Sequence, residues 1–197
     1  MLIAVAGQRG LSLVEILVSI AIVSIVLAMA APSSLAWIQN LQLRNAAESA
    51  LGGIRMARLE ALRRNTTVAF QLTDAASTAW QVCFYDPASQ SCSAAQPPIA
   101  THNASEGSAN ARYGVETTFS NFAVPLDPGA GLPALVAFDP LGRVSSSSPA
   151  NIARLDARNP TLGPAAERRL SVLVGVAGQV VMCDPALAKA TNPQGCQ

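Results

Sequence analysis

One apolar stretch near the N-terminus constrains this chain more than any other feature. Residues 11–31, LSLVEILVSIAIVSIVLAMAA, carry Glu15 as their only charge. An α-helix rises about 1.5 Å per residue, so about 20 apolar residues cross the roughly 30 Å hydrocarbon core of a bilayer. The length of this stretch therefore predicts a membrane-spanning helix.

The position of the stretch distinguishes it from an ordinary secretory signal. Such a signal has a shorter apolar region that ends in a small-residue cleavage site. Here the small residue, Gly10, comes directly before the apolar stretch and follows a short segment that carries Arg9. A cut between Gly10 and Leu11 would remove that segment as a leader and leave the whole span on the mature protein.

Glu15 is the unusual residue of the span. A carboxylate inside a membrane costs a few kcal/mol and marks a functional site by default. One interpretation is that Glu15 lies near the end of the span and reaches the lipid headgroups. The other interpretation is that it meets a partner of opposite charge in an assembly.

The residues around the predicted cut resemble a known processing signal. The sequence G-L-S-L-V-E-I-L, with Glu15 five positions after Gly10, resembles the class III prepilin signal of type IV pilins and type II secretion pseudopilins. In that family a prepilin peptidase cuts after the glycine and methylates the new N-terminus, here Leu11, where the family usually has Phe. Pro32 also fits the resemblance, because the family often has a helix-kinking proline at this point.

A long helix is predicted over residues 11–64. Pro32 removes one backbone hydrogen bond, so we expect it to kink the helix rather than end it. Gly52-Gly53 is a weak point, because each glycine costs about 1 kcal/mol relative to alanine, and Asn65 is expected to follow the helix end. Apolar residues beyond Pro32 recur at helical spacing and predict an amphipathic face: Trp37, Leu41, Ala47, Ala50, Leu51, Ile54, Ala57 and Ala61.

The end of this helix adds a second, narrower resemblance. Residues 54–68, IRMARLEALRRNTTV, are similar to the end of the first helix in the pseudopilin H and FimT/FimU-type minor pilins. The turn F-D-P-L-G-R at residues 138–143 resembles a turn of the same group. The resemblance implies the type IV pilin fold, an α+β fold in which a long N-terminal helix packs on an antiparallel β-sheet domain.

Three regions follow from these observations. Residues 1–10 are predicted to be the leader peptide, and residues 11–32 the transmembrane part of the helix. Residues 33–197 are predicted to form a periplasmic pilin-like globular domain. That domain has about 160 residues, enough for one hydrophobic core.

The globular region reads as strand-rich. Short β-branched or alternating runs bounded by turn residues predict strands at residues 67–72, 79–85, 115–123, 135–138, 168–176 and 179–182. Residues 86–98 are predicted to be a loop, 101–112 a polar insert and 145–164 a long loop. A structureless loop of that last length in a compact domain is a surface insert or hides a missed element.

The four cysteines fall into two local pairs, Cys83 with Cys92 and Cys183 with Cys196. Four cysteines allow three connectivities, and spacing alone does not choose among them. A domain facing an oxidising compartment is expected to pair its cysteines, and we expect the two local links because both flank turn-rich loops. A zinc site is the alternative, and it would need all four thiols because neither pair is C-x-x-C and His102 is the only histidine.

The sequence shows no catalytic constellation. Nucleophilic catalysis that uses histidine would have to use His102, which lies in the polar insert and is more simply a solvated loop residue. The formal net charge of +1 argues against binding nucleic acid or a membrane surface by bulk charge. We therefore expect no enzymatic activity, no cofactor and no metal.

The resemblance makes a minor pilin of a type IV pilus the leading hypothesis. Such a protein takes part in pilus assembly and priming at the tip through packing of its N-terminal helix. It would be held in the bacterial inner membrane as a single-pass protein before it enters the pilus. Its implied partners are other major and minor pilins, the prepilin peptidase and the inner-membrane assembly platform.

Two alternatives stay open. Some FimT-like relatives bind DNA for transformation through a G-R-x-R pattern near the C-terminal hairpin, where this chain has G-Q-V-V at residues 178–181. Arg168, Arg169 and Lys189 are the substitute DNA contacts. The other alternative is an H-type pseudopilin of a type II secretion system. The loop bracketed by Cys183 and Cys196 favours a pilus subunit over this alternative.

Overall fold

The computed structural model describes residues 12–106 and 109–196, except for the side chains of residues 28–34. The chain forms two compact units, residues 1–37 and 38–197. The predicted leader, residues 1–10, lies outside the described residues. One helix, α1 (Leu13–Arg64), supplies the described part of the first unit and the first element of the second.

α1 has 52 residues and continues through Pro32, whose side chain lies outside those described. Its end is a defined cap. Asn65 has a φ of 51°, and the Thr66 N–H donates to the Ala61 carbonyl at 3.3 Å. This is the Schellman arrangement, in which a left-handed residue just after the helix lets the chain satisfy a terminal carbonyl. The predicted helix end at Asn65 is confirmed.

Two antiparallel sheets follow. The first has the order β3-β2-β1-β6, and β4 also pairs with β2, beside β3. Its strands are β1 (Val68–Leu72), β2 (Trp80–Asp86), β3 (Ser91–Cys92), β4 (Ala100–His102) and β6 (Leu135–Phe138). The second has the order β5-β7-β8-β9. Its strands are β5 (Arg112–Glu116), β7 (Arg154–Arg158), β8 (Leu170–Val174) and β9 (Val180–Cys183).

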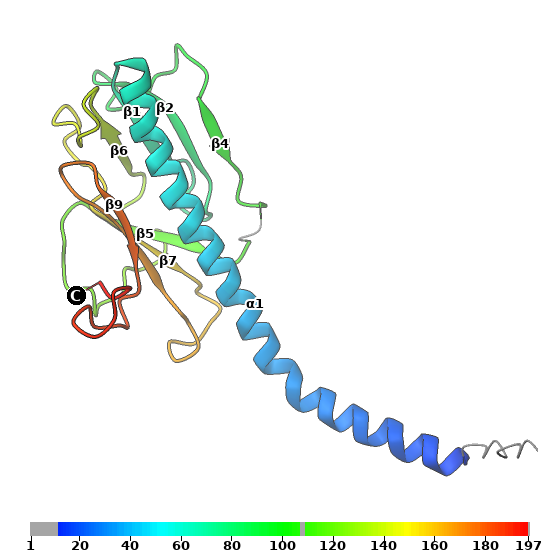
Figure 1. Ribbon diagram of the computed structural model, residues 1–197. Coiled ribbons are helices and arrows are strands. Elements are labelled where there is room, and N and C mark those ends of the chain that lie inside the picture. Colours follow the sequence, from blue (N-terminus) through cyan, green and yellow to red (C-terminus); the bar gives the residue numbers. More distant parts are fainter. Residues whose placement is uncertain (1–11, 107–108, 197) are drawn as a thin grey trace, which may run out of the picture. The chain divides into compact units, whose positions relative to one another are not determined.

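The second half of α1 packs on both sheets, as Figure 1 shows. The helix face that does so is rich in alanine, which has no side chain beyond Cβ and lets the helix approach the strands closely. Its fully buried residues are Leu43, Ala46, Ala47, Ala50, Ile54, Ala57 and Ala61. They form one core with residues of both sheets, such as Phe70 and Val172. The predicted α+β class, with a long N-terminal helix on antiparallel sheet, is confirmed.

The predicted helix face was wrong at its beginning. Trp37 and Leu41 were expected on the buried face, but their exposed fractions are 65% and 40%. The buried face begins at Leu43 instead.

The strand predictions were accurate except around the middle of the domain. β6 spans Leu135–Phe138, as predicted. The strand expected at 115–123 is β5, Arg112–Glu116, and the chain beyond it is irregular. The loop expected at 145–164 contains β7, a central strand of the second sheet. The predicted loop 86–98 contains the two-residue β3, and the polar insert 101–112 overlaps β4 and β5.

Candidate assembly surface

The described beginning of α1 is apolar on every side, and its large apolar side chains are exposed. Large apolar side chains between Leu13 and Leu27 are between 47% and 72% exposed: Leu13, Val14, Ile16, Leu17, Val18, Ile20, Ile22, Val23, Ile25, Val26 and Leu27. A helix that is apolar all round is stable when another apolar phase surrounds it, either lipid or other helices. Residues 13–27 therefore form a surface that is complete only in a membrane or an assembly.

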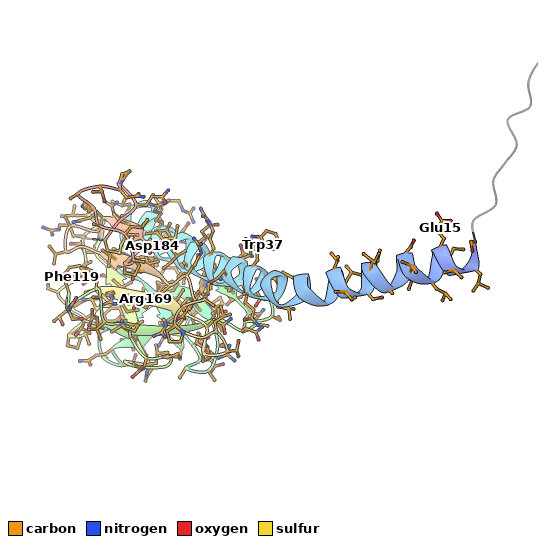
Figure 2. The ribbon with its side chains drawn as sticks, turned by 90° about the horizontal axis from the view of Figure 1, so that it is seen from below. Glu15, Trp37, Phe119, Arg169 and Asp184 are labelled. Carbon is orange, nitrogen blue, oxygen red and sulfur yellow. A yellow bond between two sulfur atoms is a disulfide. The ribbon has the colours of Figure 1, made fainter. Side chains whose placement is uncertain are left out.

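The polar side chains of this surface differ in their partners. The Ser19 hydroxyl donates to the Glu15 carbonyl, and the Ser24 hydroxyl to the Ile20 carbonyl, each at 2.7 Å. Both serines are thus satisfied inside the helix. The Glu15 carboxylate has no hydrogen-bond or ion-pair partner among the described residues, and Figure 2 shows it projecting from the start of α1. It is the charge that an assembly would have to neutralise.

Several predicted residues lie outside what the structure describes. Gly10 and Leu11, the predicted cleavage and methylation site, precede the described backbone, and the Pro32 side chain falls in the gap at residues 28–34. Among the helical residues whose side chains are described, no stretch has the length and apolarity of a membrane span. The transmembrane prediction for residues 11–32 stays a prediction.

Both local cysteine pairs are disulfides. Cys83 in β2 is joined to Cys92 in β3, with a Cα–Cα distance of 5.5 Å. Cys183 at the end of β9 is joined to Cys196, with a Cα–Cα distance of 5.1 Å. A parallel bridge between Asp184 and Gly195 also closes the C-terminal loop. The last described residues are thus tied to the edge strand of the second sheet.

The candidate DNA contacts do not form one exposed cationic group. The Arg169 guanidinium donates to an Asp156 carboxylate oxygen at 2.7 Å and to the Phe122 carbonyl at 2.6 Å. It is therefore engaged inside the domain. Arg168 and Lys189 are exposed. Lys189 lines a groove of about 230 Å³ with the partly exposed Phe119 and Val181, and it is the only charged residue in that lining.

Arg169 belongs to a buried network that the sequence analysis missed. Residues 117–127, called the strap here, lie against the second sheet. Arg154 and Asp156, both with fully buried side chains, form a two-pronged ion pair at 2.7 and 2.9 Å. Arg154 also donates to the Val124 carbonyl at 2.9 Å, and the Leu126 N–H donates to Asp156 at 3.1 Å. The network fixes the strap to the sheet.

The network also sets the ionisation of Asp156. Burial by itself would raise the pKa of this carboxyl. Hydrogen bonds from Arg154, Ser171, the Leu126 backbone and Arg169 oppose that effect and hold the pKa below its ordinary value. Asp156 is therefore a carboxylate at neutral pH, and it accepts from both sheet and strap.

His102 was expected to be a solvated loop residue, and this expectation was wrong. It lies at the end of β4, and its ring stacks on Trp80 with 5.4 Å between the ring centroids. Its Nδ1 is 2.9 Å from the Glu106 carboxylate. Within the described part of the chain, no group of three histidine, cysteine, aspartate or glutamate side chains is placed to hold a metal ion.

The comparisons with known proteins agree with this architecture. A family model described as type II transport protein GspH matches residues 46–178, and a model of the prokaryotic N-terminal methylation motif matches residues 5–31. None of the curated proteins matches the chain.

Two solved structures are similar in fold, both of the type IV minor pilin FimU from Pseudomonas aeruginosa, in different crystal forms. The first has a TM-score of 0.50 and 17% identity, and the match covers 82% of this chain and 99% of that one. The second has a TM-score of 0.46 and 18% identity, with 78% and 99% covered. The first supports the helix-on-sheet fold. Because the GspH model covers well over half of the sequence and the methylation motif precedes it, this chain belongs to the GspH family of type II transport proteins.

Proposed function

We propose that this chain is a minor pilin of a type IV pilus, which enters the pilus by packing its N-terminal helix among those of other pilins. Its family and methylation motif make it a subunit of the minor pilin or pseudopilin type. The observation that carries the proposal is the exposed apolar surface of residues 13–27, interrupted by the one carboxylate of Glu15.

Processing would prepare this surface for assembly. The prepilin peptidase cuts between Gly10 and Leu11 and methylates the Leu11 amine, which then carries a positive charge next to the span. The match of the methylation motif to residues 5–31 supports this step. Before assembly, residues 11–32 hold the subunit in the inner membrane, and residues 33–197 lie in the periplasm.

Assembly would then use two opposite charges in an apolar phase. The Glu15 carboxylate pairs with the N-terminal amine of a neighbouring subunit. Removing both ions from water costs several kcal/mol each, so the pair contributes little net stability. The pair has a stronger effect on the choice of register. A shift of one helix along the other would leave both charges unpaired in a medium of low dielectric, so other registers are disfavoured. Glu15 therefore fixes the axial register between subunits. Pro32 contributes to assembly through the kink predicted for the helix at this residue.

We place the subunit in a pilus rather than in a secretion pseudopilus. The matching family is that of the type II transport protein GspH, which keeps the H-type pseudopilin as the second candidate. The fold similarity to FimU, a type IV minor pilin, supports the pilus, as does the disulfide-closed C-terminal loop. The implied partners are major and minor pilins and the inner-membrane assembly platform, with a place among the priming subunits at the tip.

DNA binding is the weaker third candidate. Each phosphate contact adds a fixed increment of affinity through counterion release. The inward position of Arg169 leaves only Arg168 and Lys189 of the three predicted contacts exposed. The chain therefore offers too few exposed contacts at this site for tight binding at physiological salt.

A gene deletion separates the two leading candidates. Surface pili and the secretion of type II substrates are measured in the deletion strain and after complementation with the native chain. Loss of pili with normal secretion supports the proposal. Loss of secretion with normal pili contradicts it and identifies a pseudopilin.

A further inference from the structure

The uncharged part of α1 is longer than the hydrocarbon core of a bilayer is thick. No charged residue lies between Glu15 and Arg44. A helix of residues 16–43 is about 42 Å long, against a hydrocarbon core of roughly 30 Å. The helix could therefore shift along the bilayer normal by about two helical turns without moving a charged residue into the hydrocarbon core.

Trp37 is the residue in this region whose side chain favours one depth of the helix in the bilayer. Its side chain is 65% exposed, although tryptophan is mostly buried in folded domains. The described residues offer its indole N–H no hydrogen-bond partner, whereas the indole of Trp80 donates to the Ser49 hydroxyl at 2.9 Å. An exposed indole with a free donor matches the membrane interface, where one side of the ring is apolar and the other is wet.

The spacing between Glu15 and Trp37 fits the thickness of a bilayer. The two residues are 22 positions apart in the same continuous helix, which corresponds to about 33 Å. A helix placed with Glu15 at one headgroup layer has Trp37 at the other. Figure 2 shows Trp37 and Glu15 projecting from α1, well separated along it.

We propose that Trp37 is a membrane-interface anchor, whose indole lies in the headgroup region of the outer leaflet and sets the depth of the subunit before assembly. This inference rests on the proposed function, because it requires the N-terminal part of α1 to cross the inner membrane before assembly. The partner is a phospholipid surface, and the contact is lost when the subunit leaves the membrane for the pilus.

The residues after Trp37 in sequence belong to an aqueous environment. Gln39, Asn40 and Gln42 are polar. Asn40 already takes part in the folded domain, since its amide donates to the Ala166 carbonyl at 2.9 Å and its oxygen accepts from the Arg168 N–H at 2.8 Å. A deeper insertion of the helix into the bilayer would have to take these groups out of water. The polar residues therefore limit the depth of insertion to the position of Trp37.

Depth-dependent fluorescence quenching tests the anchor on the full chain in vesicles. The vesicles contain phosphatidylcholine brominated close to the headgroup, at the middle of the acyl chain or near its end. The native chain is compared with Trp37→Phe, so that the difference reports Trp37 and removes the contribution of the buried Trp80. We expect the shallow bromines to quench most strongly, and Trp37→Phe to abolish that quenching.

The outcomes are distinct. Strongest quenching by bromines near the chain end would place Trp37 in the bilayer centre and overturn the anchor. A chain that floats with the vesicles but is not quenched at any depth would leave Trp37 in water or against protein, and would overturn the anchor alone. A chain that does not float with the vesicles contradicts both the anchor and the membrane-held stage of the proposed function. Trp37→Tyr, which keeps an amphipathic ring, serves as the conservative control for flotation.

Discussion

At the scale of single residues, Glu15 is predicted to serve assembly rather than folding. Glu15→Ala and Glu15→Gln should both lower the number of pili, because each removes the charge that we propose to pair with a neighbour's N-terminus. The melting temperature of the globular domain should not change, since Glu15 has no partner among the described residues. Glu48→Gln is the matched control, because Glu48 is an exposed carboxylate on the same helix, paired with Arg44.

Normal numbers of pili in both variants, at normal protein levels, would contradict the assembly role. The carboxylate would then only reach the headgroups. A loss of protein in the Glu15 variants would instead point to a role in membrane insertion. Immunoblots of membrane fractions run beside electron micrographs separate these results.

Asp156 is predicted to be among the most sensitive positions of the domain. Asp156→Asn removes the two-pronged carboxylate partner of the buried Arg154, which keeps only the longer ion pair with Glu116 at 3.2 Å, and it weakens contacts to both strap and sheet. Breaking one side of a buried ion pair costs about 3–5 kcal/mol, and urea denaturation measures this loss. Glu48→Gln breaks an exposed pair and should cost less than about 1 kcal/mol.

The lowered pKa of Asp156 makes the stability of the folded domain depend on pH. Its pKa is lower in the folded chain than in the unfolded chain. The stability that this shift contributes is therefore complete above the unfolded value of about 3.9 and is lost as the pH falls through the lower, folded value. Proteolysis within the strap should accelerate only below about pH 4. Acceleration between pH 5 and 7 would mean that another group controls the strap.

At the scale of elements, the adjacent glycines of α1 are predicted to respond oppositely to alanine. At Gly52, an added Cβ would meet nothing within 4 Å, so alanine should stabilise the helix by up to about 1 kcal/mol. At Gly53, the Cβ would lie 2.8 Å from the Phe70 ring and 3.1 Å from Trp80. Overpacking of that kind costs about 1–3 kcal/mol.

Thermal melting of the two single variants tests this pair. Equal changes would show that the helix does not approach the first sheet as closely as Gly53 requires. The sequence predicted Gly52-Gly53 only as a weak point of the helix. In the structure Gly53 is a point of close approach between α1 and the strands, and the glycine pair alone could not distinguish these roles.

The C-terminal disulfide loop is predicted to stabilise the second sheet. The Cys183–Cys196 link closes a loop with a sequence separation of 13, which corresponds to roughly 3 kcal/mol in the chain-entropy model. Replacing both cysteines by serine should lower the free energy of unfolding by about that amount. Peptide mapping without reduction should recover the 83–92 and 183–196 links, and a crossed pairing would contradict the fold of the tail.

The sequence predicted those elements whose signals are local. The helix end at Asn65 follows from turn chemistry, and the apolar run of β6 is visible as a buried strand. β7 was missed because Arg154 and Asp156 look like surface residues, although they alternate with Leu155 and Ala157 as in a strand. Their burial depends on each other and on the strap, and no local pattern shows that long-range pairing.

At the scale of the whole molecule, the mature chain is predicted to begin at Leu11. The prediction rests on the methylation motif matched at residues 5–31 and on Gly10, which directly precedes the apolar stretch. Intact-mass analysis of the membrane form should give a chain of residues 11–197 with one methyl group on the N-terminus. A mature chain that begins at Met1 or beyond Ala31 would contradict the pilin assignment, and a peptidase-deficient strain provides the uncut control.

The candidate assembly surface could be located from the sequence, but its lack of partners could not. Apolar residues between Leu13 and Leu27 are visible in the sequence, yet only the structure shows them exposed. The position of Trp37 was misjudged for the same reason, since helical spacing does not say where the globular domain begins to cover the helix. That boundary is set by contacts such as those of Asn40 with Ala166 and Arg168, far away in the sequence.

The packing of the second half of α1 has a mechanical consequence if the first half is held in an assembly, as proposed above. α1 is one helix from Leu13 to Arg64, so a pull on its apolar end reaches the globular domain through the same element. The second half of that helix meets both sheets through its alanine face. Extraction of the helix would therefore have to shear all these contacts together rather than peel them one at a time. Shearing all these contacts at once takes a larger force than peeling the same contacts in sequence.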